Sequence, residues 1–137
     1  MKMSPETKNI DCVLKLDRLV FDRIEFSRSG FKNDHDLNLS VDVDIGKNDE
    51  SEYYRVKLSI RGEKSDEYKF MVQVSGFFRL DGDIPFEKDV LLRKNAVAIL
   101  MPYLRSEVSL LTAQPEMDCV VLPPFNIDAL MDEAENR

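Results

Sequence analysis

The clearest pattern along the chain is a strict alternation of apolar and polar residues, which predicts three successive β-strands. The first has apolar residues at Leu37, Leu39, Val41, Val43 and Ile45. The same period of two runs through residues 54–61 and 68–75, and continues toward Leu80. Successive side chains of a strand point to opposite faces, so each strand has one apolar and one solvated face.

An earlier segment, residues 13–26, is strand-like but changes phase. Leu14 and Leu16 share one face, whereas the following run Leu19-Val20-Phe21 is apolar on both faces. A β-bulge or a bend in the strand accounts for such a change. The sequence therefore predicts a fourth strand that is irregular near its middle.

The connections differ in length. Residues 46–49 and 62–66 are short polar breaks that start with glycine, which predicts hairpins and an antiparallel meander of the last three strands. Residues 27–36 form a longer polar stretch, interrupted by Phe31. This stretch can cross over from the first strand to the second without a tight turn.

Beyond residue 83 the period becomes helical, with apolar residues three or four apart at Val97, Leu100, Met101, Leu104, Val108 and Leu111. Pro102 predicts either a kink or the first turn of this helix, and Gln114-Pro115 predicts its end. Residues 119–124 are apolar and extended, because each proline disfavours helix in the residue before it. Asn126 or Asp128 can cap a last short helix over residues 127–135.

This order of elements predicts an α+β fold in one domain, residues 1–137. Strands occupy about residues 11–80 and helices about residues 86–135. The four strands form an antiparallel sheet with a crossover between strands one and two. One long helix packs on the sheet, and a short C-terminal lid helix follows on a proline-rich tether.

Charge and composition narrow the function. The chain has 137 residues with a net charge of −7, and its 19 basic residues are scattered among 26 acidic ones. Binding to nucleic acid or to an anionic membrane needs a basic patch, so both are disfavoured. The N-terminus has no apolar signal region and the apolar run 96–101 is too short to span a bilayer, which predicts a cytoplasmic protein.

Catalytic and metal-binding patterns are weak. Cys12 and Cys119 lie on apolar stretches and are predicted to be buried thiols. His35 stands in a charged loop and is predicted to be solvated, although a pocket that pairs it with Asp or Glu would keep an enzyme open as an alternative. The sequence has no zinc-ligand spacing and no nucleotide-binding glycine motif, so we expect no catalytic residues, metal or cofactor.

Two blocks in the second half resemble the SecB family of protein-export chaperones. Residues 98–108, Ala-Ile-Leu-Met-Pro-Tyr-Leu-Arg-Ser-Glu-Val, resemble the central helix of that family. Residues 122–130, Leu-Pro-Pro-Phe-Asn-Ile-Asp-Ala-Leu, resemble its Leu-Ala-Pro-Val-Asn-Phe-Asp-Ala-Leu segment. Residues 14–26 also resemble its opening strand, so the likeness covers nearly the whole chain.

The resemblance implies a holdase that binds unfolded polypeptide in apolar grooves without ATP and assembles as a dimer of dimers. The implied groove residues are Leu39, Val41 and Val43 on strand two, with Phe125, Ile127, Leu130 and Met131 around the lid. The alternative for the strand-two residues is ordinary packing in the core. Met131 is a flexible side chain that suits varied clients.

One departure from the family weakens the export role. The resemblance implies docking on the SecA motor through acids near the end of strand one, but Arg23 stands where the family has Asp and Ser27 where it has Glu. Charge reversal at a docking surface lowers both the association rate and the affinity. The alternatives are therefore a dedicated chaperone for one partner, such as an antitoxin, or an interaction protein that has lost promiscuous binding.

Overall fold

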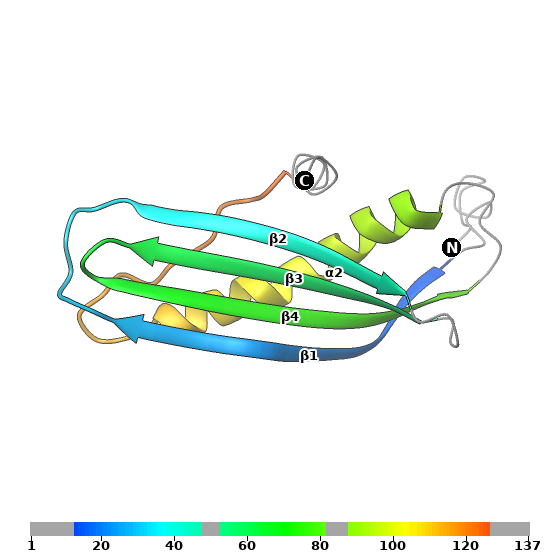
Figure 1. Cartoon of the computed structure of the whole chain (residues 1–137), viewed down its shortest axis with the longest axis horizontal. Helices are drawn as coiled ribbons and strands as arrows, with labels where there is room; N and C mark the ends of the chain where they lie inside the picture. Colours follow the sequence, from blue (N-terminus) through cyan, green and yellow to red (C-terminus); the bar gives the residue numbers. More distant parts are fainter. Residues whose placement is uncertain (1–12, 48–52, 82–87, 127–137) are drawn as a thin grey trace, which may run out of the picture.

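Four strands form one antiparallel sheet in the order β1-β4-β3-β2 (Figure 1). The computed structural model describes residues 13–47, 53–81 and 88–126. Its strands are β1 (Val13–Arg28), β2 (Leu37–Lys47), β3 (Tyr53–Lys64) and β4 (Tyr68–Asp81). The predicted meander is confirmed, and so is the crossover, because β1 and β2 lie at opposite edges of the sheet. Residues 29–36 pass around the β3–β4 turn to connect them (Figure 1).

The register places apolar and polar side chains on separate faces of the sheet. One row across all four strands is Phe21, Val74, Leu58 and Val43. The next row toward the crossover, on the opposite face, is Arg23, Gln73, Ser59 and Asp42. The alternation in the sequence therefore predicts correctly which residues face the core.

The phase change in β1 corresponds to two irregularities in its pairing with β4. The register shifts between Leu16 and Arg18 and again between Phe21 and Arg23, so Asp17 and Asp22 are the extra residues. The Asp22 carboxylate accepts a hydrogen bond from the Ser75 hydroxyl, and the Asp17 carboxylate lies 3.8 Å from the Arg79 guanidinium. The bulges thus place two acids beside polar partners on β4.

The second predicted turn is misplaced. The sequence favours a break over residues 62–66, but β3 continues to Lys64 and the turn covers residues 65–67. Gly62 stays in the ladder, opposite Leu39 and Phe70, because its missing side chain makes room for the Phe70 ring. The glycine is needed for packing and not for a turn.

One helix, α2 (Lys88–Thr112), packs on the apolar face, mainly over β4 and β3 and less over β1. Its side chains Val97, Leu100, Leu104 and Val108 are completely buried. Pro102 lies in the helix interior and is exposed, so it is not in the first turn. The helix ends before Gln114-Pro115, as predicted.

An extended segment, residues 113–126, returns alongside α2. The Arg105 guanidinium donates to the Leu122 carbonyl at 2.8 Å, and the Ser109 hydroxyl donates to the Val120 carbonyl at 2.8 Å. Leu122 is buried, whereas Cys119 and Val121 are exposed. The prediction of a buried Cys119 is wrong, because Val120 and Leu122 take the core-facing positions of this segment and the Cys119 thiol lies at the surface, 3.3 Å from the Ser109 carbonyl oxygen. Cys12 and the predicted helix 127–135 lie outside the described residues.

Candidate functional site

The apolar row of β2 is only half-buried. Leu39, Val41 and Val43 point to the same side of the sheet as α2, opposite Gly62, Ile60 and Leu58 of β3. They pack against the edge of the core without being enclosed by it. The cause is the position of the helix, which lies over β4 and β3, whereas β2 is the outermost strand. Between the two alternatives for these residues, core or groove, the structure gives an intermediate burial.

Phe125 is half-buried and packs against this same core. It lies at the end of the extended segment, which crosses behind the sheet from the far end of α2 toward β2 (Figure 1). Val120 and Met117 of this segment also pack against the core. The predicted groove residues Leu39, Val41, Val43 and Phe125 therefore lie on one side of the sheet, whereas Ile127, Leu130 and Met131 lie outside the described residues.

The outer edge of β2 also offers main-chain groups. Among the described residues β2 pairs with β3 alone, because it is the last strand in the order of the sheet. An edge strand presents a row of N–H and C=O groups that can pair with another chain. An extended polypeptide can therefore add hydrogen bonds at this edge while its side chains meet the apolar row.

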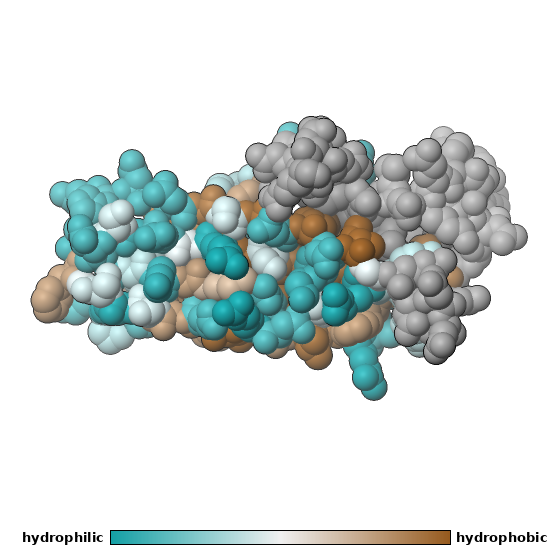
Figure 2. Space-filling view, viewed as in Figure 1, coloured by the Kyte–Doolittle hydropathy of each residue, from teal (hydrophilic) through white to brown (hydrophobic). Residues whose placement is uncertain are grey.

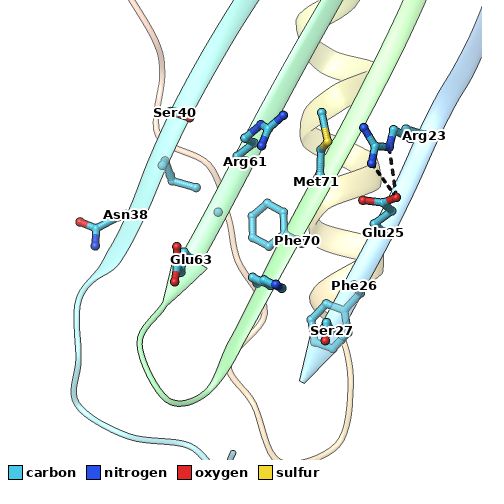
Figure 3. Close-up of a pocket in the computed structure, with 13 residues that line it drawn as sticks. Arg23, Glu25, Phe26, Ser27, Asn38, Ser40, Arg61, Glu63, Phe70 and Met71 are labelled. Atoms are coloured by element: carbon cyan, nitrogen blue, oxygen red, sulfur yellow. Dashed lines mark hydrogen bonds and ion pairs between the residues drawn. The ribbon is translucent and has the colours of Figure 1, made fainter. Parts of the chain in front are cut away.

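The opposite face of the sheet is polar and carries a shallow hollow of about 580 Å³ near the crossover end (Figure 3). Figure 2 shows this face, with hydrophilic side chains over most of the strands. Arg61, Lys69 and Arg23 line the hollow together with Glu25 and Glu63. Arg23 and Glu25 form an ion pair at 3.0 Å.

The second hollow, of about 680 Å³, lies between α2 and the extended segment. Leu110 and Val121 line it and are 70% and 77% exposed, and Tyr103 on α2 is 47% exposed. Sequence reasoning missed this surface. The available signal was that Tyr103 and Leu110 fall outside the helical stripe of core residues.

No protein-family model matches the chain. It is 30% identical over 133 residues to an uncharacterized protein of Methanocaldococcus jannaschii, covering 90% of this chain and 86% of that protein. It is 26% identical over 108 residues to the protein-export protein SecB of Rickettsia bellii, covering 73% of this chain and 71% of that protein.

The solved structure of the SecB-like chaperone of Mycobacterium tuberculosis, in complex with a ChAD peptide from the HigA1 antitoxin, has the same fold. The TM-score is 0.67 at 14% identity, and the match covers 82% of this chain and 88% of that chain. The sequence similarity to SecB and the shared fold together support a SecB-like assignment. The predicted resemblance to SecB is thereby confirmed for the chain as a whole, as is the four-stranded SecB-like sheet with one helix.

His35 lines neither of the two hollows. His35 is exposed, and its Nδ1 lies 2.7 Å from the Ser65 carbonyl oxygen and 4.0 Å from the Asp66 carboxylate. In the described part of the chain, no three His, Cys, Asp or Glu side chains are grouped to hold a metal ion. No helix in that part is both long enough and apolar enough to cross a membrane.

Proposed function

We propose that this SecB-like protein is a holdase chaperone that binds unfolded polypeptides, such as export precursors, in an apolar groove without ATP. The observation that carries the proposal is the half-buried row Leu39, Val41 and Val43 on an edge strand. A half-buried apolar row on a strand that has a described neighbour on one side only suits an extended ligand.

The two parts of this surface supply different kinds of affinity. Burial of apolar client side chains on the row contributes about 25 cal/mol for each Å² removed from water. Main-chain hydrogen bonds at the β2 edge are independent of client sequence. A groove that combines the two accepts many sequences, provided that the segment is extended and accessible. Folded proteins rarely offer such segments.

The lid residues belong to the same proposal. Ile127, Leu130 and Met131 follow directly after Phe125, which packs on the groove side of the sheet. We expect them to cover a bound client from this end. Met131 suits the task because its unbranched side chain adapts to different partners.

Assembly into a dimer of dimers would strengthen capture. The outer surface of α2 and the extended segment carries Tyr103, Leu110 and Val121, which are exposed and apolar. Such a patch favours contact with another copy of the chain. Several grooves on one particle then bind separate segments of a client, and the effective concentration makes weak contacts tight.

Docking on the SecA motor is the weakest part of the export role. Arg23 and Ser27 stand where the family has acids. They line the shallow hollow on the polar face of the sheet together with Arg61 and Lys69. The local charge is therefore more basic than the family pattern implies, which disfavours the family's docking mode. The antitoxin peptide bound by the Mycobacterium tuberculosis relative supports the alternative of a single dedicated polypeptide partner.

The test is capture of a permanently unfolded polypeptide, reduced and carboxymethylated α-lactalbumin, measured by fluorescence anisotropy. Val41→Asp places a charge on the apolar row, and we expect it to weaken binding by tenfold or more, since about 1.4 kcal/mol corresponds to tenfold. Ser40→Asp adds the same charge on the opposite face of the same strand and should leave binding unchanged. A wild-type protein that captures no unfolded probe overturns the general holdase and leaves the dedicated partner as the better explanation.

A further inference from the structure

Glu67 is a fully buried carboxylate at the crossover end of the sheet, away from the apolar row. It lies in the β3–β4 turn, where Asp66 has a left-handed φ of 62°. Its Oε1 atom forms an ion pair with Lys64 Nζ at 2.9 Å. Its Oε2 atom is buried without a hydrogen-bond partner among the described residues. A buried charge is costly to desolvate, so its presence here calls for a specific reason.

The contacts of Glu67 hold the crossover at its start and near its middle. At the start, the Glu67 carbonyl accepts the N–H groups of Ser29 at 2.8 Å and Gly30 at 3.2 Å. Near the middle, Glu67 Oε1 accepts the N–H of Asn33 at 3.0 Å. The Asn33 side chain in turn donates to the Ser65 carbonyl at 2.8 Å. One residue thus fixes the start and the middle of the loop that leads into β2.

The backbones approach each other closely at this point. A Cβ atom on Gly30 would lie 2.1 Å from the Asp66 carbonyl oxygen, so only glycine permits the contact. The crossover and the turn are therefore packed directly against each other.

The same network reaches the first residue pair of the groove strand. Lys64, the ion-pair partner of Glu67, is directly opposite Leu37 in the β2–β3 ladder. Leu39 follows two residues later on the same face. In the described structure β2 has a ladder on one side only, and α2 packs over other strands. The start of β2 is therefore restrained by its ladder with β3 and by the crossover that leads into it.

We propose that Glu67 is a positioning residue for the groove, which holds the Leu37–Leu39 end of β2 in its binding geometry through Lys64 and Asn33. This inference rests on the proposed holdase function. A strand end that is already ordered binds an extended client at a smaller entropic cost than one that must be ordered on binding. The buried charge of Glu67 therefore costs folding stability, but it orders one end of the groove before a client binds.

The decisive variant separates stability from positioning. Glu67→Gln breaks the ion pair and is expected to lower both stability and client affinity. The double change Lys64→Met with Glu67→Leu removes both charges, and replacement of a buried ion pair by apolar side chains is often neutral or stabilising. It also removes the acceptor for the Asn33 N–H, so positioning stays lost even where stability returns.

Two measurements are made on each protein, with Cys12 and Cys119 changed to serine. The first compares the affinity for carboxymethylated α-lactalbumin with the free energy of unfolding in urea. The second is the yield of cross-linking to that probe from a single reporter cysteine, at Leu39→Cys or at Ile45→Cys near the other end of β2. We expect the double variant to regain stability, to bind about fivefold to tenfold more weakly, and to lose cross-linking at 39 but not at 45.

The alternatives give different results. If affinity recovers together with stability, or if both reporter positions change equally, Glu67 has a purely structural role and the inference is wrong while the holdase stands. If the wild-type protein binds no probe at all, the proposed function fails, and the inference fails with it.

Discussion

Gly62 lies in the sheet at a point where any side chain would collide with an aromatic ring. A Cβ atom built there would lie 2.3 Å from Cζ and 2.4 Å from Cε1 of Phe70, on the neighbouring strand. Phe70 is almost fully buried, so its ring cannot move into solvent without a loss of packing. The Phe70 ring thus occupies the space that a residue-62 side chain would take.

We expect Gly62→Ala to lower the free energy of unfolding by about 1–3 kcal/mol, the usual cost of overpacking a core. Gly46→Ala is the matched control, because no atom lies within 4 Å of its added Cβ. Alanine is favoured over glycine in a strand by about 0.5–1 kcal/mol, so the control should be neutral or slightly stabilising. Urea denaturation at equal chain concentration measures both, and equal stability of the two variants would contradict this explanation of Gly62.

The ionisation of Glu67 gives stability a specific pH dependence. Burial raises the pKa of the Glu67 carboxyl, but hydrogen bonds from Lys64 and from the Asn33 backbone, with the charges of Lys64 and Arg28, outweigh it and set the pKa below its usual value. A group whose pKa is lowered on folding binds fewer protons in the folded state. Its contribution to stability is present above the unfolded pKa of about 4.3 and is lost as pH falls through the folded value.

The difference in unfolding free energy between the wild type and Glu67→Gln should therefore be constant near pH 7 and shrink as the pH falls below about 4.3. Urea titrations at several pH values measure it. A difference that stays constant down to the acid unfolding limit would mean that Glu67 does not ionise differently in the folded state.

At the scale of single residues, the sequence predicts well which face of the sheet a side chain occupies. It predicts poorly which side chains of neighbouring strands come into close contact. The side chains of Leu39, Val41 and Val43 could be assigned to one face, because a period of two leaves no choice. A glycine in a polar stretch is typical of a turn, so the sequence favours a turn at Gly62. Its actual role depends on Phe70, which is adjacent only after the strands have paired.

Among the elements, α2 carries an interior proline. Pro102 has no N–H, so the carbonyl four residues earlier, on Ala98, receives no helical hydrogen bond from it. The Pro102 side chain is exposed and contributes little to the core. The helix is held instead by residues on its buried side, including Leu100 and Leu104.

Pro102→Ala restores the missing donor, and we expect it to raise the free energy of unfolding by about 1–3 kcal/mol. Ser106→Ala, one turn later and also exposed, is the control and should change stability by no more than about 0.5 kcal/mol. Thermal and urea unfolding measure both variants. A loss of stability in Pro102→Ala would indicate that the core packing requires the bend that proline imposes.

The elements themselves could be predicted, except where side chains hold an irregular segment. The four strands and the long helix follow from their periods. The course of residues 113–126 does not, because Arg105, Ser109 and Thr112 on the helix bind its main chain. Local sequence carries no signal for such contacts, and the exposure of Cys119 could not be foreseen without them.

At the scale of the whole molecule, the two sides of α2 differ in exposure. The sheet side of α2 is filled by the core, whereas its outer side leaves Leu110 70% exposed beside Val121, which is 77% exposed. The half-buried β2 row lies on the edge strand, whereas α2 packs mainly over β4 and β3. We expect association through the patch to leave the β2 row accessible, as the proposed holdase function requires.

Assembly through the outer surface of α2 can be tested by placing charges on it. We expect the wild-type mass in light scattering to be that of four 15.8 kDa chains, and Leu110→Asp with Val121→Asp to reduce it to that of a smaller species. Both side chains are exposed, so the charges cost the protomer little, but facing charges at an apolar contact strongly disfavour association. Asn38→Asp, on the polar face of β2, should leave the mass unchanged.

The same variant also separates assembly from the groove. The smaller species keeps Leu39, Val41 and Val43, so we expect it to bind a short apolar peptide with wild-type affinity. Its affinity for a long unfolded chain should fall by about 10²-fold or more, because separate grooves no longer act on one client. If the wild type is a monomer, or if the variant retains the four-chain mass, the outer surface of α2 is not the assembly contact.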